Sequence, residues 1–177
     1  MSEPKPAQAV KLVASIFSAV DDAAGAAMKA LSAEFGRTDF ISAPLPFAYT
    51  DYYTGEMGRP LRRRFLSFEE LVRPEALPDV KRCTNRLEKK FEDGGRRLVN
   101  IDPGYLSPSH LILATGKGYA HRPYLREGIY ADLTLIFCKG SFGVLPWTYP
   151  DYAEAETIGL FNRLRRKYLL QLNLLHS

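Results

Sequence analysis

The chain has 177 residues, 46% of them hydrophobic and 25% charged, which suits one globular domain with a sizeable core. Its apolar runs fall short of the ~20 residues of a membrane span, and no apolar segment follows a basic start, so neither a membrane helix nor a signal peptide is expected. The formal charge of +4 permits an anionic partner without requiring one. Cys83 and Cys138 lack CxxC spacing, which indicates reduced thiols in a cytoplasmic protein rather than a disulfide scaffold or a zinc site.

The first half of the chain alternates extended and helical patterns, after a flexible lead-in at residues 1–7. Val10–Val20 is apolar and β-branched, which predicts a buried strand. Ala23–Phe35 has the spacing of an amphipathic helix, which Asp21 and Asp22 would cap and Gly36 would end. There follow an aromatic edge segment with prolines (Phe40–Tyr53), a glycine-containing loop (Thr54–Pro60) and a second extended run (Leu61–Leu71).

The second half repeats this alternation and ends in a long helix. Pro74–Glu92 reads as a helix stopped by the glycines that follow. Two strands then meet at Asp102-Pro103-Gly104, where turn-forming residues predict a reversal or kink of the chain. The closing elements are a hairpin (Gly128–Lys139 with Ser141–Trp147) and a helix (Asp151–Leu175) that Thr148 or Asp151 would cap.

This order of elements predicts an α+β fold for a single domain at residues 8–175. The first six elements match the ferredoxin-like βαββαβ arrangement, to which a β-hairpin and a C-terminal helix are added. An antiparallel sheet with its helices on one face is the simplest way to bury these elements.

Polar side chains concentrate around the expected reversal, and arginines lie in the preceding extended run. Asn100, Asp102 and Tyr105 flank the Pro-Gly pair, while Arg62 and Arg64 share one face of a strand and Arg63 takes the other. Guanidinium groups bind phosphates or carboxylates in a bidentate manner, which suits a nucleotide or nucleic acid. The alternative is a charged edge strand that only keeps the protein soluble.

Carboxylates and histidines supply further candidates, none with a metal-binding motif. The acidic set could hold Mg²⁺ or Mn²⁺ if it converged, or could pair with the abundant arginines; its members are Asp51, Glu56, Asp102, Glu127 and Asp132. The three histidines, His110, His121 and His176, have no metal-ligand spacing. His121 lies on a loop with Arg122 and Tyr124, where an imidazole could serve as a general acid or base, or simply lie at the surface.

The chain also holds ten tyrosines. Tyrosine with arginine can stack the bases of single-stranded RNA, although the RNP1 string of RNA recognition modules is absent. The structural alternative is that most of these rings line the boundary of the core, with the segment Pro146–Tyr152 anchoring the last helix.

The strings RRRFLSFEELV, RLVNIDPGYLSPSHLILAT, HRPYLREGIYADLTLIF and LPWTYPDY resemble an uncharacterised prokaryotic family of about 180 residues. The resemblance covers residues 8 to 173 and implies no established activity, although some members are loosely labelled GTP-binding proteins. Neither a GxxxxGK[ST] loop nor an Asn-Lys-x-Asp guanine reader is present, so conventional GTPase activity is not expected.

The leading hypothesis is therefore binding of a phosphate-bearing small ligand such as a nucleotide. The sequence leaves open whether the protein also hydrolyses that ligand. The expected ligand-binding residues are Arg62, Arg64, Asn100, Asp102, Tyr105, Arg122 and Tyr124. Candidates for catalysis are His121, Asp102 and Glu127, with no metal site. The alternatives are an RNA-binding module without catalysis and a protein-interaction subunit, and the sequence does not identify a cofactor or an oligomeric state.

Overall fold

The computed structural model describes residues 3–175, so His176 lies outside the described part of the chain. The helices are α1 (Asp21–Phe35), α2 (Thr54–Met57), a 3-10 turn (Pro74–Ala76), α3 (Leu77–Lys90), α4 (Pro150–Ala153) and α5 (Ala155–Leu175). The strands are β1 (Val10–Ser18), β2 (Thr38–Ile41), β3 (Leu45–Pro46), β4 (Arg62–Val72), β5 (Glu92–Asp93), β6 (Arg96–Arg97), β7 (Val99–Leu106), β8 (His110–Thr115), β9 (Tyr124–Arg126), β10 (Ile129–Cys138) and β11 (Ser141–Val144).

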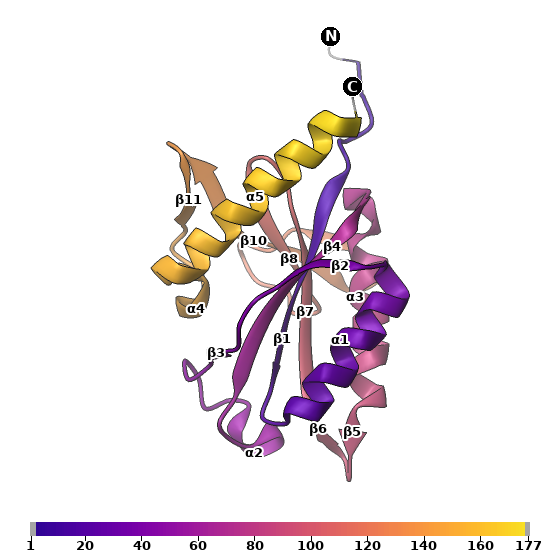
Figure 1. Cartoon of the computed structure of the whole chain (residues 1–177), viewed down its shortest axis with the longest axis vertical. Coiled ribbons are helices and arrows are strands. Elements are labelled where there is room, and N and C mark those ends of the chain that lie inside the picture. The colour runs from indigo at the N-terminus through magenta and orange to yellow at the C-terminus, as the bar shows by residue number, and fades with distance from the viewer. Residues whose placement is uncertain (1–2, 176–177) are drawn as a thin grey trace.

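An antiparallel sheet organises this α+β fold (Figure 1). Within residues 3–175 it has nine strands, in the order β11-β10-β8-β7-β1-β4-β2, with β3 beside β4 and β9 beside β10. Every strand pair in it is antiparallel. The short strands β5 and β6 form a separate ribbon after α3.

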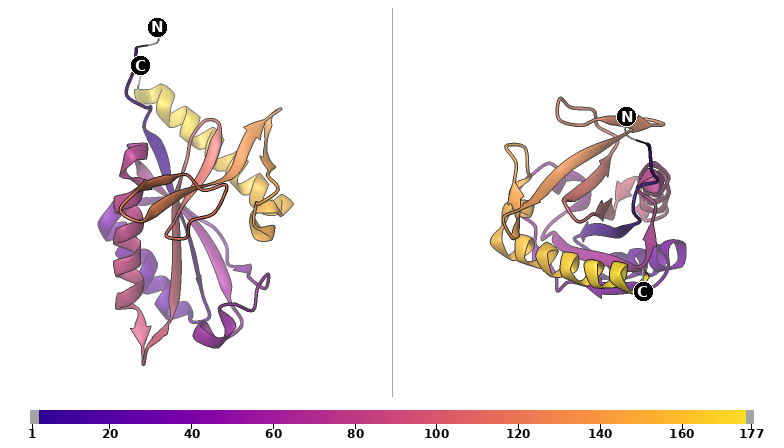
Figure 2. Two further views of the ribbon diagram at one scale, coloured as in Figure 1. Left: turned by 180° about the vertical axis from the view of Figure 1, so that it is seen from behind. Right: turned by 90° about the horizontal axis from the view of Figure 1, so that it is seen from above.

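Strand β1 is central, and all nine of its residues are buried. Successive side chains of a strand point to opposite faces, so Leu12, Ala14 and Ile16 pack with α1 and α3. On the other face Val13 joins a cluster that includes Phe161 and Tyr168 of α5. Helices therefore cover both faces (Figure 2), and the expectation of helices on one face is wrong. A strand buried on both faces is largely apolar, as β1 is. Its buried Lys11 is satisfied by the carboxylate of Asp39.

The principal error in the predicted elements concerns the Pro-Gly pair. Strand β7 runs through Pro103 and Gly104 without turning, and the chain reverses at residues 107–109 instead. There the Ser107 hydroxyl accepts hydrogen bonds from the backbone of residues 109 and 110. Gly104 serves a close approach, because a Cβ atom on it would lie 2.3 Å from the carbonyl oxygen of Ile112 on β8.

Two expected helix caps are also wrong. Helix α1 begins directly at Asp21, and Val20 precedes it without a side-chain cap. The carboxylates of Asp21 and Asp22 instead lie in the first turn, where they interact favourably with the helix dipole. Neither Thr148 nor Asp151 caps the helix that follows it. Thr148 donates its hydroxyl to the carbonyl oxygen of Thr134, and Asp151 pairs with Arg63.

Other boundaries shift by a few residues. The aromatic segment before residue 54 splits into β2 and β3, and both pair with β4. The expected loop after it contains the one-turn helix α2, and the expected closing helix divides into α4 and α5 at Glu154. The hairpin of β10 and β11 turns at Lys139 and Gly140, whose φ angles of 51° and 89° fit a type I′ turn.

A cleft between diverging strands as the candidate functional site

A cleft of about 660 Å³ opens where β7 and β8 part. The two strands pair only between residues 104–106 and residues 111–113. Before residue 104, the edge of β7 that faces away from β1 has no strand partner within residues 3–175, and Asn100 and Asp102 line the cleft there. Ala114, Thr115 and Lys117 line the opposite side, so the divergence of the strands creates the space.

Side chains of α3 complete the open edge of β7. The Lys81 ammonium donates to the carbonyl oxygen of Ile101 at 3.0 Å, and a Glu88 carboxylate oxygen accepts the N–H of Ile101 at 2.5 Å. Lys81 also lies 3.6 Å from the carboxylate of Asp102. Burial raises the pKa of Glu88 despite the nearby charge of Lys81. These charged groups therefore replace backbone hydrogen bonds that a neighbouring strand would supply.

Arg97 holds the next part of this wall. Its guanidinium donates to the side-chain oxygen of Asn100 at 3.0 Å and to Glu56 at 2.9 Å. Asn100 in turn donates to Asp102 at 2.8 Å. The ring of Tyr53 lies 5.6 Å from the Arg97 guanidinium, and burial raises the pKa of Tyr53 to about 12. The Tyr53 hydroxyl therefore remains a hydrogen-bond donor at neutral pH.

A buried ion pair between Arg63 of β4 and Asp151 of α4 forms part of the cleft wall. The side chains of the two residues are only 7% and 9% exposed. The Arg63 guanidinium lies 4.3 Å from the ring centroid of Phe47 and 5.2 Å from that of Phe17. Among the described residues, Arg63 thus sits between aromatic rings with Asp151 as its carboxylate partner, and this pair ties α4 to β4.

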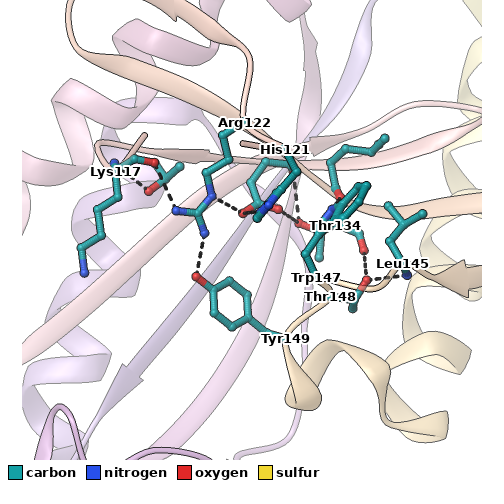
Figure 3. Close-up of polar contacts among 11 residues, drawn as sticks. Lys117, His121, Arg122, Thr134, Leu145, Trp147, Thr148 and Tyr149 are labelled. Carbon is teal, nitrogen blue, oxygen red and sulfur yellow. Dashed lines mark hydrogen bonds and ion pairs between the residues drawn. The ribbon is translucent and has the colours of Figure 1, made fainter. Parts of the chain in front are cut away.

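Arg122 organises the opposite wall (Figure 3). Its guanidinium donates to the Asp132 carboxylate at 2.7 Å, to the Lys117 carbonyl oxygen at 3.1 Å and to the Tyr149 hydroxyl at 2.8 Å. These partners come from β10, from the segment after β8 and from the segment before α4. One side chain therefore fixes three segments around the cleft.

His121 lies beside this wall but is not among the residues that line the cleft. Its ring stacks on Trp147 at 4.8 Å between centroids, and its Nε2 is 3.7 Å from the Asp132 carboxylate. Trp147 donates its indole N–H to the carbonyl oxygen of Leu133 at 2.8 Å. In Figure 3 the stacked rings lie next to the Arg122 network, so His121 supports the wall from outside the cavity.

The structure brings together only part of the expected ligand-binding set. Asn100, Asp102 and Arg122 line the cleft. Four of the expected ligand-binding residues do not line it. Arg62 pairs with Asp21, and Arg64 donates to the Ser42 carbonyl oxygen. Tyr105 packs beside Leu77, and Tyr124 contacts Tyr130. The catalytic candidate Glu127 also lies outside the lining and pairs with Arg82 and Arg126.

The acidic set pairs with cations instead of converging. Its ion pairs are Asp51 with Arg59, Glu56 with Arg97, Asp102 with Lys81, Glu127 with Arg82 and Arg126, and Asp132 with Arg122. Within residues 3–175, no three His, Cys, Asp or Glu side chains are placed to hold a metal ion. Both cysteines are free thiols, Cys83 buried and Cys138 exposed.

Sequence reasoning missed several cleft residues, although two had a readable signal. Arg63 lies two residues before Phe65, so strand alternation puts it on the same inward face as that core residue. Lys81 lies four residues after Leu77 and therefore on the buried face of α3. Nothing in the local pattern placed Tyr53, Asp151 or Tyr152 in a cleft, because they reach it only through tertiary packing.

A family model described as domain of unknown function (DUF4416) matches residues 8–168. The chain belongs to the DUF4416 family. Every residue that lines the cleft lies within the part that the DUF4416 model covers. No curated protein and no solved structure matches this DUF4416 chain significantly. Among the described residues of this DUF4416 protein, no helix combines the length and apolar character that crossing a membrane requires.

Proposed function

We propose that this DUF4416 protein binds a phosphate-bearing small ligand, such as a nucleotide, in the cleft between β7 and β8. The observation that carries the proposal is the convergence of cationic side chains from separate segments on one cavity: Arg63, Lys81, Arg97, Lys117 and Arg122. Four carboxylates line the same cavity, those of Glu88, Asp102, Asp132 and Asp151, so its charge is positive by one unit. Positive charge in a concave, partly apolar site favours an anionic ligand. A volume of about 660 Å³ lies within the usual range for small-molecule pockets.

Lys117 is the cation most available to a phosphate. Among the residues described, it forms no ion pair with a carboxylate, and its ammonium lies 4.9 Å from the ring centroid of Tyr52 on the other lip of the cleft. Tyr49, Tyr53 and Tyr149 add further aromatic surface to the walls. An aromatic wall beside a cation suits a ligand that combines a planar group with a phosphate.

Hydrolysis of the ligand is a second step of the proposal, and Asp102 is its candidate general base. Of the three catalytic candidates, Asp102, His121 and Glu127, Asp102 is the one that lines the cleft. About a third of its side chain is exposed there, and Lys81 lies 3.6 Å away. This step is tested by measuring the inorganic phosphate released from a bound nucleotide. The wild-type protein should release phosphate, and Asp102→Asn should not.

Binding is tested by a thermal-shift screen of nucleotides and sugar phosphates, followed by calorimetry on the best compound. A ligand that binds only the folded state stabilises it by ~2.7 kcal/mol at a hundredfold excess over its Kd. Arg122→Ala should weaken binding by roughly 10- to 100-fold, because a charge-assisted hydrogen bond contributes about 1.5–3 kcal/mol. The matched control Arg62→Ala removes an arginine outside the cleft and should leave the Kd unchanged. Equal affinities of the two variants, or no bound compound, would refute the proposal.

Single-stranded RNA is the second candidate ligand. It is favoured by tyrosines that are largely exposed on segments next to the cleft, Tyr52 at 69% and Tyr119 at 70%, because such rings can stack bases. RNA binding through phosphate contacts would weaken steeply with salt, since each neutralised phosphate releases counterions. Absence of binding at low salt, or a flat salt dependence, would exclude it.

We also infer a ferredoxin-like core within a single folding unit at residues 8–175. The inference is supported by the strand order β7-β1-β4-β2, in which β4 lies between β1 and β2 as in a split βαβ unit. Both large core clusters include residues of β1, so they should unfold together. Two separate transitions in chemical denaturation would contradict the single unit.

A further inference from the structure

Two buried hydroxyl groups lie next to each other at or beside the cleft wall, and neither makes a hydrogen bond of normal geometry among residues 3–175. They belong to Ser15 of β1 and Tyr152 of α4, whose exposed fractions are 2% and 3%. Ser15 is paired in register with Asp102 of β7, and Tyr152 lies beside both Ser15 and Arg63. Tyr152 and Asp102 line the cleft. Native proteins rarely leave such groups unpaired, so this part of the cleft suits a polar guest.

The deep part of the cleft is close to charge-balanced, unlike its rim. Arg63 is paired with Asp151, and Lys81 lies beside Asp102. Lys117 at the rim has no carboxylate partner in the described chain. A phosphate dianion would therefore be repelled by Asp102 at depth and attracted by the rim, whereas an uncharged polar group would fit at depth.

We propose that the floor formed by Asp102 and Tyr152, with Ser15 behind it, is a subsite for the hydroxyl groups of a sugar. The ligand is then a sugar phosphate or a nucleotide whose phosphate reaches Lys117 and Arg122. This subsite rests on the binding function proposed above and specifies its ligand class. It assigns Asp102 to the sugar, in place of the general-base role considered above for hydrolysis.

The chemistry of each floor residue matches a sugar hydroxyl. The Asp102 carboxylate accepts hydrogen bonds from vicinal hydroxyls, as acidic residues do for ribose in dinucleotide sites. The Tyr152 hydroxyl can donate to a hydroxyl oxygen, and Ser15 lies beside Tyr152. Burial raises the pKa of Tyr152 to about 12, so its hydroxyl remains protonated at neutral pH. A site built to hydrogen-bond a hydroxyl rejects an analogue that lacks it, because its own buried polar groups are left unpaired.

The first test compares four probes by calorimetry with the wild-type protein: ribose 5-phosphate, AMP, 2′,3′-dideoxy-AMP and inorganic phosphate. We expect ribose 5-phosphate and AMP to bind at least tenfold more tightly than 2′,3′-dideoxy-AMP and inorganic phosphate. Equal Kd values for AMP and its dideoxy analogue would overturn the sugar subsite while leaving phosphate binding intact. If none of the four binds, the proposed function fails and the subsite fails with it.

The second test uses two conservative variants of buried tyrosines. Tyr152→Phe should weaken ribose 5-phosphate about tenfold and leave inorganic phosphate unchanged, since one hydrogen bond to the sugar is lost. Tyr168→Phe is the matched control, because its hydroxyl donates to the carbonyl oxygen of Ala9, remote from the cleft lining. An equal effect of Tyr152→Phe on both probes, or no effect on ribose 5-phosphate, would overturn the assignment. A thermal melt of each variant establishes that it is folded.

Discussion

The ion pair of Arg63 and Asp151 offers the sharpest test of how the cleft is held together. Asp151→Ala removes the carboxylate and leaves the Arg63 guanidinium 7% exposed between aromatic rings. An uncompensated buried charge costs about 3–5 kcal/mol, a large share of the 5–15 kcal/mol that stabilises a typical domain. We therefore expect the free energy of unfolding to fall by about 3–5 kcal/mol.

Urea denaturation of the wild-type protein and of matched variants measures this change. Asp21→Ala is the control, because Asp21 also lies in the first turn of a helix and also pairs with an arginine, Arg62. That pair is exposed, so its loss, including the interaction with the helix dipole, should cost about 1 kcal/mol.

The double variant Arg63→Met with Asp151→Ala separates two effects of the single substitution: the loss of the ion pair, and the cost of leaving the Arg63 charge buried without a partner. Replacing both partners by uncharged groups should recover part of the stability lost in Asp151→Ala, because no buried charge remains. The reasoning would be refuted if Asp151→Ala cost less than about 1 kcal/mol, or if the double variant were less stable than it.

Three further predictions follow from packing, charge and the single tryptophan. Gly104→Ala should destabilise the fold by about 1–3 kcal/mol, because its Cβ would lie 2.3 Å from the Ile112 carbonyl oxygen. Gly25→Ala in helix α1 is the control, because a Cβ atom there would meet nothing within 4 Å outside the helix's own backbone. It should stabilise the fold by about 0.5–1 kcal/mol in the same urea assay. The opposite ranking of the two variants would contradict this packing. Burial acts to raise the pKa of Asp39, but hydrogen bonds from lysine and serine side chains outweigh it and hold the pKa below its ordinary value. The stability from Asp39 is thus present above its unfolded pKa of about 4 and lost as pH falls through the folded value, so denaturation curves of Asp39→Asn should show a shallower acid decline and lower stability at pH 7 than wild type. Because Trp147 is the chain's single tryptophan and stacks beside the Arg122 wall, its emission should change when a ligand fills the cleft, and unchanged emission at saturation would place the ligand elsewhere.

Much of the fold could be predicted because its main elements follow local patterns. The hairpin of β10 and β11 was predicted from strand-like runs on either side of Gly140, and the structure confirms it. Helix α1 likewise follows its apolar spacing to its end at Gly36. Pro103-Gly104 was misread because the pair has a different role in this sheet. Proline lacks an N–H and lies where the edge of β7 is unpaired, and glycine allows β8 to approach.

The site was less predictable than the fold for two physical reasons. A one-residue change in register moves a side chain to the opposite face of a sheet, so choosing Arg62 and Arg64 over Arg63 moved the expected basic site out of the cleft. The second reason is distance along the chain. Asp151 reaches Arg63 only after α4 has folded back on the sheet, and no local pattern records that contact.

Arg122 is one of the expected residues that line the cleft, and it lies on a loop, where the side chain's direction does not depend on strand register. Two of its neighbours in the chain, Lys117 and Tyr119, also contact it in the structure.

The cleft also shows why a list of cations overstates the affinity of a site for anions. Lys81 completes the hydrogen bonding of β7, Arg63 anchors α4, and Arg122 joins three segments, so each already has oxygen partners before any ligand arrives. A ligand phosphate gains only the difference between those partners and itself. Lys117 has no carboxylate to give up among the described residues, so it offers a phosphate the largest net gain. The divergence of β7 and β8 thus creates a cavity whose wall charges are mostly paired within the protein, so the proposed phosphate ligand would gain most of its binding energy at the rim.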